Sequence, residues 1–194
     1  MLRINSPHTV EGLHDLLALR ESRSRPDARV IPKCKSAEVI RLVAEVLGGA
    51  RSTIGVVPMV EPGRADFIAD QMAQAHERVC GLFLGGADRT ADLKAEGSRG
   101  KLAFARSWIG PAAVSMGIAA IDAPYSKGDG AGLRREAATS RKLGMTGKAV
   151  LHADQLATIN AVFAPTAEAA PRAESVMVAY GASDARTPVL TVTS

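Results

Sequence analysis

Aromatic residues and cysteines are scarce in this chain of 194 residues. Phe, Trp and Tyr together make up only 4% of the residues, so aliphatic side chains must fill the hydrophobic core. The two cysteines, Cys34 and Cys80, lie far apart, which excludes a disulfide-rich scaffold and a CxxC-type metal or redox motif. Two isolated thiols are typical of a reducing compartment, and we expect a cytoplasmic protein.

Long apolar runs and clusters of basic residues are also missing. No apolar run approaches the ~18–20 residues of a membrane span, and the N-terminus has no signal-peptide core. The formal net charge is +4, but Lys and Arg are spread along the chain without interleaved aromatics. We therefore expect neither a membrane nor a nucleic-acid partner, whereas an acidic small molecule, such as one carrying phosphates, fits the charge.

Short apolar runs alternate with longer segments of helical periodicity. The runs predicted as strands are residues 2–5, 28–32, 53–60, 81–84, 117–122 and 147–152. The segments predicted as helices are residues 9–20, 36–49, 64–79, 98–116, 131–144, 153–164 and 166–181, with a disturbance near Pro111. Six β–α units of this kind predict a parallel sheet, because parallel strands need crossover connections. Two architectures fit the pattern, an open doubly wound sheet and a (β/α)8 barrel, and periodicity does not separate them.

Polar residues follow several of the predicted strands. Glu61 and Asp88 come after two consecutive strands, at the end where parallel sheets carry their active sites, and two such carboxylates can share Mg²⁺. The alternative is that Asp88 caps a turn and that Glu61 is solvated. Gly85 and Gly86 either let a ligand approach the backbone or form a tight turn. Residues Lys33, Asp122 and His152 also stand at strand ends: the lysine is either an anion contact or solvated, and the histidine is more often structural.

Five segments occur in one order and spacing, namely RVIPKCKSAE, VVPMVEPGRADF, GLFLGGADRTADL, GIAAIDAPYSKGDGAGL and KLGMTGKAVLHADQLATINAVFAPT. Together they resemble the citrate lyase beta-subunit family, which includes malyl-CoA and citramalyl-CoA lyases within a wider group of metal-dependent aldolases. The resemblance runs from about Leu2 to Tyr180. It implies a TIM-barrel-type (β/α)8 fold, here incomplete, with about six β–α units and a C-terminal helix in one domain over residues 1–181. A tail, residues 182–194, follows.

The resemblance also implies a site and a reaction. Glu61 and Asp88 match the family's metal ligands, for Mg²⁺ or alternatively Mn²⁺, and the backbone of Gly86 and Ala87 matches its substrate-binding segment. The implied activity is a Mg-dependent carbon–carbon lyase. Its substrate is the acyl-CoA or acyl-carrier thioester of a small hydroxy-dicarboxylate, such as a citramalyl-, malyl- or citryl-thioester, and a 2-oxo acid is the other partner. We expect a homo-oligomer. The acid, the carrier and the direction of the reaction stay open.

This sequence departs from the family pattern at several positions. Ala87 stands where the family usually has Glu, and Ala153 follows His152 where the family has Pro. The match begins at the family's third strand, so we expect the first two β–α units, and the arginine that clamps the substrate carboxylate, to be missing. Candidates to replace that arginine are Arg29, Arg64 and Arg89. The chain alone is then a poor catalyst, or, as the alternative, a catalytically defective relative that serves as a ligand-binding or assembly subunit.

Overall fold

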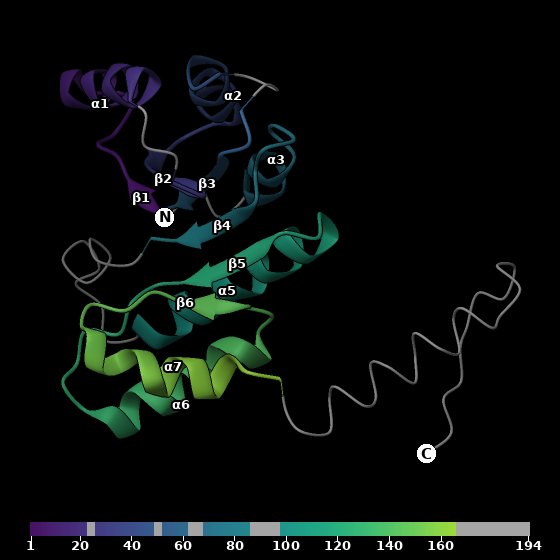
Figure 1. Cartoon of the computed structure of the whole chain (residues 1–194). Helices are drawn as coiled ribbons and strands as arrows, with labels where there is room; N and C mark the ends of the chain where they lie inside the picture. Colours follow the sequence, from purple (N-terminus) through teal and green to yellow (C-terminus); the bar gives the residue numbers. More distant parts are fainter. Residues whose placement is uncertain (23–25, 49–51, 62–67, 86–97, 166–194) are drawn as a thin grey trace, which may run out of the picture. The chain divides into compact units, whose positions relative to one another are not determined.

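A computed structural model describes residues 1–22, 26–48, 52–61, 68–85 and 98–165 of the chain. The part up to Val162 forms one compact α/β unit. Its centre is a parallel sheet of six strands that stand in the order of the sequence. The strands are β1 (Leu2–Arg3), β2 (Ala28–Cys34), β3 (Gly55–Val60), β4 (Gly81–Leu84), β5 (Ala119–Asp122) and β6 (Gly147–Lys148). Figure 1 shows the sheet curling like part of a barrel, with helices around its outer side.

The strand order decides between the two architectures that the sequence leaves open. In a doubly wound sheet the order reverses at the middle, which puts helices on both faces. Here every strand pairs in parallel with the strand that precedes it in the chain. All crossovers therefore run the same way around the sheet, as in a TIM barrel. The predicted incomplete barrel is confirmed.

The helices alternate with the strands as predicted, with changes at their ends. They are α1 (Val10–Glu21), α2 (Ala37–Val46), α3 (Ala69–Ala73), α5 (Ser98–Ser115), α6 (Gly130–Lys142) and α7 (Leu156–Phe163), with a short 3₁₀ helix η3 (Ala153–Gln155) before the last. α5 runs through Pro111 over nearly the predicted range, and buried Ile109 and Ala113 hold the helix on both sides of the proline. The predicted helix 166–181 and tail 182–194 lie outside the described residues.

Both faces of the sheet are mostly apolar, as expected for strands covered on each side. On the side facing the helices, Ile31, Val56, Leu82 and Ala120 are completely buried. The opposite, concave face carries a cluster of Ala28, Val30, Val57 and Met59, against which Phe83 and Ile121 pack. Aliphatic residues thus supply most of the core, as the low aromatic content requires.

A network of buried charges lies between the sheet and two of the outer helices. Asp122, at the end of β5, accepts hydrogen bonds from Nε and Nη2 of Arg106 on α5, both at 2.9 Å, and from the Ser140 hydroxyl on α6. The Nζ of Lys148, on β6, lies 2.6 Å from Asp122 and 2.8 Å from Glu136. Two cations and two anions therefore hold β5, β6, α5 and α6 together.

Asp122 is a structural residue in this arrangement. Burial by itself raises the pKa of a carboxyl, but the hydrogen bonds from Arg106 and the charge of Lys148 outweigh it and hold the pKa of Asp122 below its ordinary value. The third N–H group of Lys148 donates to the carbonyl oxygen of Ala123 at 2.6 Å. All three donors of the ammonium group are thus engaged.

We expect Lys148→Met to destabilise the protein strongly, because it leaves two carboxylates to share one buried cation. Breaking a buried ion pair in this way costs roughly 3–5 kcal/mol. The matched control is Arg135→Met, since Arg135 is 76% exposed and 3.9 Å from its partner Asp129. Its expected loss is within about 0.5 kcal/mol. Urea unfolding of both variants compares the two free energies, and equal losses would contradict the network's role.

We also expect the free energy of unfolding to fall as the pH drops below about 4, the ordinary aspartate range. Because the pKa of Asp122 is lowered in the folded state, the unfolded chain takes up the proton first. The stability that Asp122 contributes is present above that range and is lost as the pH falls toward the folded-state value. Asp122→Asn should flatten this dependence, whereas a variant of the exposed Asp154, Asp154→Asn, should keep it. Unfolding curves at several pH values test this.

Candidate functional site

The carboxyl ends of β3 and β4 lie next to each other at one edge of the sheet. The two strands pair in register, with Met59 opposite Phe83 and Val60 opposite Leu84. The arrowheads of β4, β5 and β6 point the same way in Figure 1, toward this edge. Glu61 directly follows β3. The predicted ligand Asp88 and the predicted substrate contacts Gly86 and Ala87 lie outside the described residues, so their positions stay predictions.

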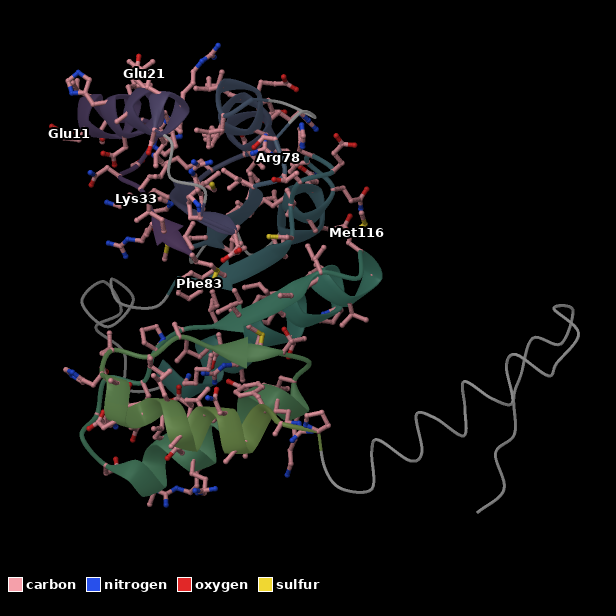
Figure 2. The ribbon with its side chains drawn as sticks, viewed as in Figure 1. Glu11, Glu21, Lys33, Arg78, Phe83 and Met116 are labelled. Carbon is pink, nitrogen blue, oxygen red and sulfur yellow. The ribbon has the colours of Figure 1, made fainter. Side chains whose placement is uncertain are left out.

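Glu61 is held on the concave side of the sheet edge. The backbone N–H of Lys33, on β2, donates to Glu61 Oε1 at 3.1 Å. On the other side, a Cβ atom added to Gly85 would lie only 3.0 Å from Glu61 Cγ. The side chain therefore passes between the end of β2 and the end of β4, and it is half-buried. Figure 2 labels Lys33 at this edge of the sheet.

The Glu61 carboxylate fits the chemistry of a hard divalent cation. It is partly shielded from water, and its recorded contact is with a neutral N–H group, which orients the carboxylate without neutralising its charge. Mg²⁺ typically uses one or two carboxylates and keeps waters or substrate oxygens in its other positions. Within the described ranges there is no group of three or more His, Cys, Asp or Glu that would make a complete protein cage. An oriented carboxylate whose charge remains available suits a cation of this kind.

Cys34 is a buried thiol close to this carboxylate. Burial, together with the negative charge of Glu61, raises the pKa of the Cys34 thiol to about 12. Its Sγ lies 3.5 Å from the carbonyl oxygen of Ile31, to which it donates. A thiol that stays protonated is neither a thiolate ligand nor an activated nucleophile.

The other strand-end residues have different positions. Asp122 points toward the outer helices and belongs to the buried charge network. His152 is exposed, and its carbonyl oxygen accepts a hydrogen bond from the Gln155 N–H at 3.2 Å. Gln155 also donates through Nε2 to the carbonyl oxygen of Tyr125 at 3.2 Å, which ties the loops after β5 and β6 together.

A tyrosine–aspartate pair at the same edge was missed by the sequence reasoning. The hydroxyl of Tyr125 donates to Asp129 Oδ2 at 2.6 Å, and Asp129 is the N-cap of α6. The hydrogen bond to Tyr125 lowers the pKa of Asp129, which keeps the carboxylate charged at the helix terminus. An Asp placed immediately before a glycine and a helical segment is the N-cap signal that would have identified it.

The arginines considered for anion binding differ in where they lie. Arg29 lies on the helix-facing side of β2 and is almost completely buried, so it is not available to a ligand on the concave side. Arg64 and Arg89 lie outside the described residues. Arg3, which the sequence reasoning overlooked, is exposed, and its register with Val30 places it on the concave face of the sheet. Strand alternation from Leu2 to Arg3 is the signal that would have found it.

None of the helices in the described ranges is both long enough and apolar enough to cross a bilayer.

Comparison with known proteins gives a family match over most of the chain. The HpcH/HpaI aldolase/citrate lyase family matches residues 1–153. The human mitochondrial citramalyl-CoA lyase is 32% identical over 197 residues, covering 92% of this chain and 58% of the relative. The citrate lyase subunit beta of Escherichia coli K12 is 31% identical over 193 residues, covering 94% of this chain and 63% of the relative. The chain thus spans about three fifths of the length of these curated relatives.

Solved structures agree with this match and with the fold. The crystal structure of RipC from Yersinia pestis has a TM-score of 0.79 and 35% sequence identity, covering 86% of this chain and 77% of that one. The citrate lyase beta subunit of Mycobacterium tuberculosis, complexed with oxaloacetate and magnesium, has a TM-score of 0.69 and 27% identity, covering 84% and 72%. Since the family match includes every described strand, this chain belongs to the HpcH/HpaI aldolase/citrate lyase family.

Proposed function

We propose that this chain is a Mg²⁺-dependent carbon–carbon lyase acting on a thioester of a small hydroxy-dicarboxylate. The carrier is CoA or an acyl-carrier group, and the candidates are citramalyl-, malyl- and citryl-thioesters. The observation that carries the proposal is the placement of Glu61. It is an oriented, half-buried carboxylate on the concave side of the sheet edge, next to the strand whose continuation contains Asp88.

The relatives support this class of reaction. Citramalyl-CoA lyase and citrate lyase subunit beta are named as lyases, whereas (3S)-malyl-CoA thioesterase is named for the hydrolysis of a malyl thioester and supports only the substrate class. Related structures hold magnesium with oxaloacetate, or magnesium with acetoacetate and coenzyme A. These ligands belong to those proteins, and their transfer to this chain is part of the proposal.

We assign the following roles to the chain's own residues. Glu61 and Asp88 hold the cation, which is Mg²⁺ or Mn²⁺, and the backbone N–H groups of Gly86 and Ala87 bind the substrate carboxylate. When bound, such a cation acts as a Lewis acid that polarises an oxygen of the acid and offsets the charge that develops on carbon–carbon cleavage. Fixed backbone N–H groups add to this stabilisation because they need no reorganisation during the reaction.

Arg3 is our candidate for the far carboxylate of the acid. It is exposed on the concave face of β1, two strands away from Glu61 in the same sheet. A guanidinium group binds a carboxylate through two parallel hydrogen bonds, which gives both affinity and orientation. Arg3 takes the place of Arg29 as a candidate, because the Arg29 side chain is buried on the side of the sheet that faces the helices.

The alternative function, a ligand-binding or assembly subunit without turnover, is favoured by one residue. Ala87 stands where the related enzymes usually carry a glutamate, immediately before Asp88. Loss of that carboxylate leaves the cation ligands and the acid-binding groups in place. The two functions therefore share their binding properties and differ in turnover.

We expect Mn²⁺ to bind the wild-type protein and to bind at least about 10-fold more weakly to Glu61→Gln and to Asp88→Asn. Each substitution keeps the shape of the side chain and removes one of two anionic ligands. Electron paramagnetic resonance of free Mn²⁺ measures the dissociation constants, with Asp154→Asn as the control. An unchanged affinity in either variant would remove that residue from the proposed site.

We expect Arg3→Ala to weaken binding of oxaloacetate in the presence of Mg²⁺ by roughly 10- to 100-fold, the loss typical of a hydrogen bond to a charged group. Mn²⁺ affinity should not change, because Arg3 does not contact the cation. Calorimetric titration of the acid tests this, with the exposed Arg135→Ala as the control.

Cleavage of citramalyl-CoA and malyl-CoA in excess Mg²⁺ then separates the lyase from the subunit without turnover: rates of ~1–10³ s⁻¹ identify an enzyme.

A further inference from the structure

Lys33 has a backbone conformation that side chains of its kind rarely adopt. Its φ is +54°, and no other non-glycine residue in the described ranges has a positive φ. The left-handed region is unfavourable for residues with a Cβ atom, so the surrounding structure must enforce it. Such positions are often found beside functional groups, where the strain serves to aim an atom.

A β-bulge at the end of β2 explains this conformation. Ile31 pairs with Pro58, but the next recorded pair is Cys34 with Val60, so β2 uses one residue more than β3 over the same distance. The extra length falls on Pro32 and Lys33. Pro32 has no N–H group to offer to the sheet, and a bulge is one of the few places in a sheet that tolerates it. Bulges at the rims of barrels re-aim groups at the strand ends.

The group re-aimed here is the Lys33 N–H, which donates to Glu61 Oε1 at 3.1 Å. Gly85 bounds the same side chain from the β4 side, since a Cβ atom there would approach Glu61 Cγ to 3.0 Å. The φ of Gly85 is not in the left-handed region, so the missing Cβ provides space, not backbone freedom. Glu61 is therefore restrained from both sides by features of the backbone.

We propose that Lys33 and Gly85 are positioning residues that fix the orientation of the Glu61 carboxylate. Lys33 acts through its left-handed backbone and not through its ammonium group. The inference rests on the proposed function in one respect: the oriented Glu61 carboxylate is taken to bind a cation. A neutral N–H group aims the carboxylate and leaves its negative charge available, whereas an ammonium group at the same place would compete with the cation. The Lys33 side chain is exposed, which agrees with a role for the backbone.

Three substitutions at position 33 separate the backbone from the charge. Lys33→Gly and Lys33→Asn remove the ammonium group, and both new residues tolerate a positive φ. Lys33→Val also removes the ammonium group, but a β-branched residue disfavours a positive φ. We expect the first two to bind Mn²⁺ within about 2-fold of wild type and Lys33→Val to bind at least 10-fold more weakly. Melting temperatures measured in EDTA show whether each variant remains folded. Equal weakening in all three would overturn the proposal, as would full affinity in Lys33→Val.

Gly85→Ala tests the other side of Glu61 without disturbing β2. Its methyl group should push the Glu61 side chain away and weaken Mn²⁺ binding by several-fold while the protein stays folded. Gly128→Ala is the matched control, because no atom lies within 4 Å of a Cβ at that position. Unchanged affinity in Gly85→Ala would contradict the restraint from β4.

An amide measurement without metal keeps the inference separate from the proposed function. In the metal-free protein, the amide proton of residue 33 should be protected from hydrogen exchange in wild type and in Lys33→Gly, and should lose protection in Glu61→Ala. If wild type binds no Mn²⁺ but this pattern holds, the proposed cation site fails and the positioning role stands. Protection that is unaffected by Glu61→Ala would overturn the positioning role, whatever the metal result.

Discussion

Parallel pairing of each strand with its predecessor is the constraint on which the rest of this structure depends. It sends every crossover helix around the same side of the sheet and gathers all carboxyl ends at one edge. Residues that are 28 positions apart, Lys33 and Glu61, therefore share a hydrogen bond. The segment that follows Gly85 begins at the same edge, on the neighbouring strand.

The face on which a side chain lies then decides its role. Asp122 and Glu61 both stand at the ends of strands, yet Asp122 faces the helices and Glu61 the concave side. Cationic and hydroxyl donors satisfy Asp122, which binds the layers together. A neutral N–H orients Glu61 and leaves its charge free. Alternation along a strand thus separates a structural carboxylate from one that suits a ligand.

Much of the fold could be predicted from the sequence because strong periodicity coincides with clear breaks. The strand 81–84 was predicted with its observed ends, since glycines bound a short apolar run. The strand predicted over 147–152 is only Gly147–Lys148, and beyond it the Leu151 N–H donates to the side chain of Gln155 and not to a neighbouring strand. The strand predicted over 28–32 extends to Cys34, because the bulge carries it past Pro32. Tertiary contacts of this kind leave no pattern in the local sequence, so they cannot be predicted from it.

The site was predictable in part, for the same reason. Glu61 follows an obvious strand, so its position at the sheet edge could be inferred from order alone. The roles of Lys33 and Gly85 depend on register and on a close approach between strands, which composition and spacing do not encode. Its place near a strand end makes Arg29 a candidate from the sequence, but alternation along β2 turns its side chain toward the helices.

The buried Lys148 has a consequence for the kind of carbon–carbon chemistry open to this chain. Some aldolases use a lysine amine at a strand end as a nucleophile that forms a Schiff base with a carbonyl substrate. That route requires an unprotonated nitrogen with an open lone pair facing the ligand. Lys148 faces the helices, and its nitrogen donates to Asp122, to Glu136 and to the Ala123 carbonyl. This lysine is thereby committed to holding the strands, and covalent amine catalysis by it is excluded.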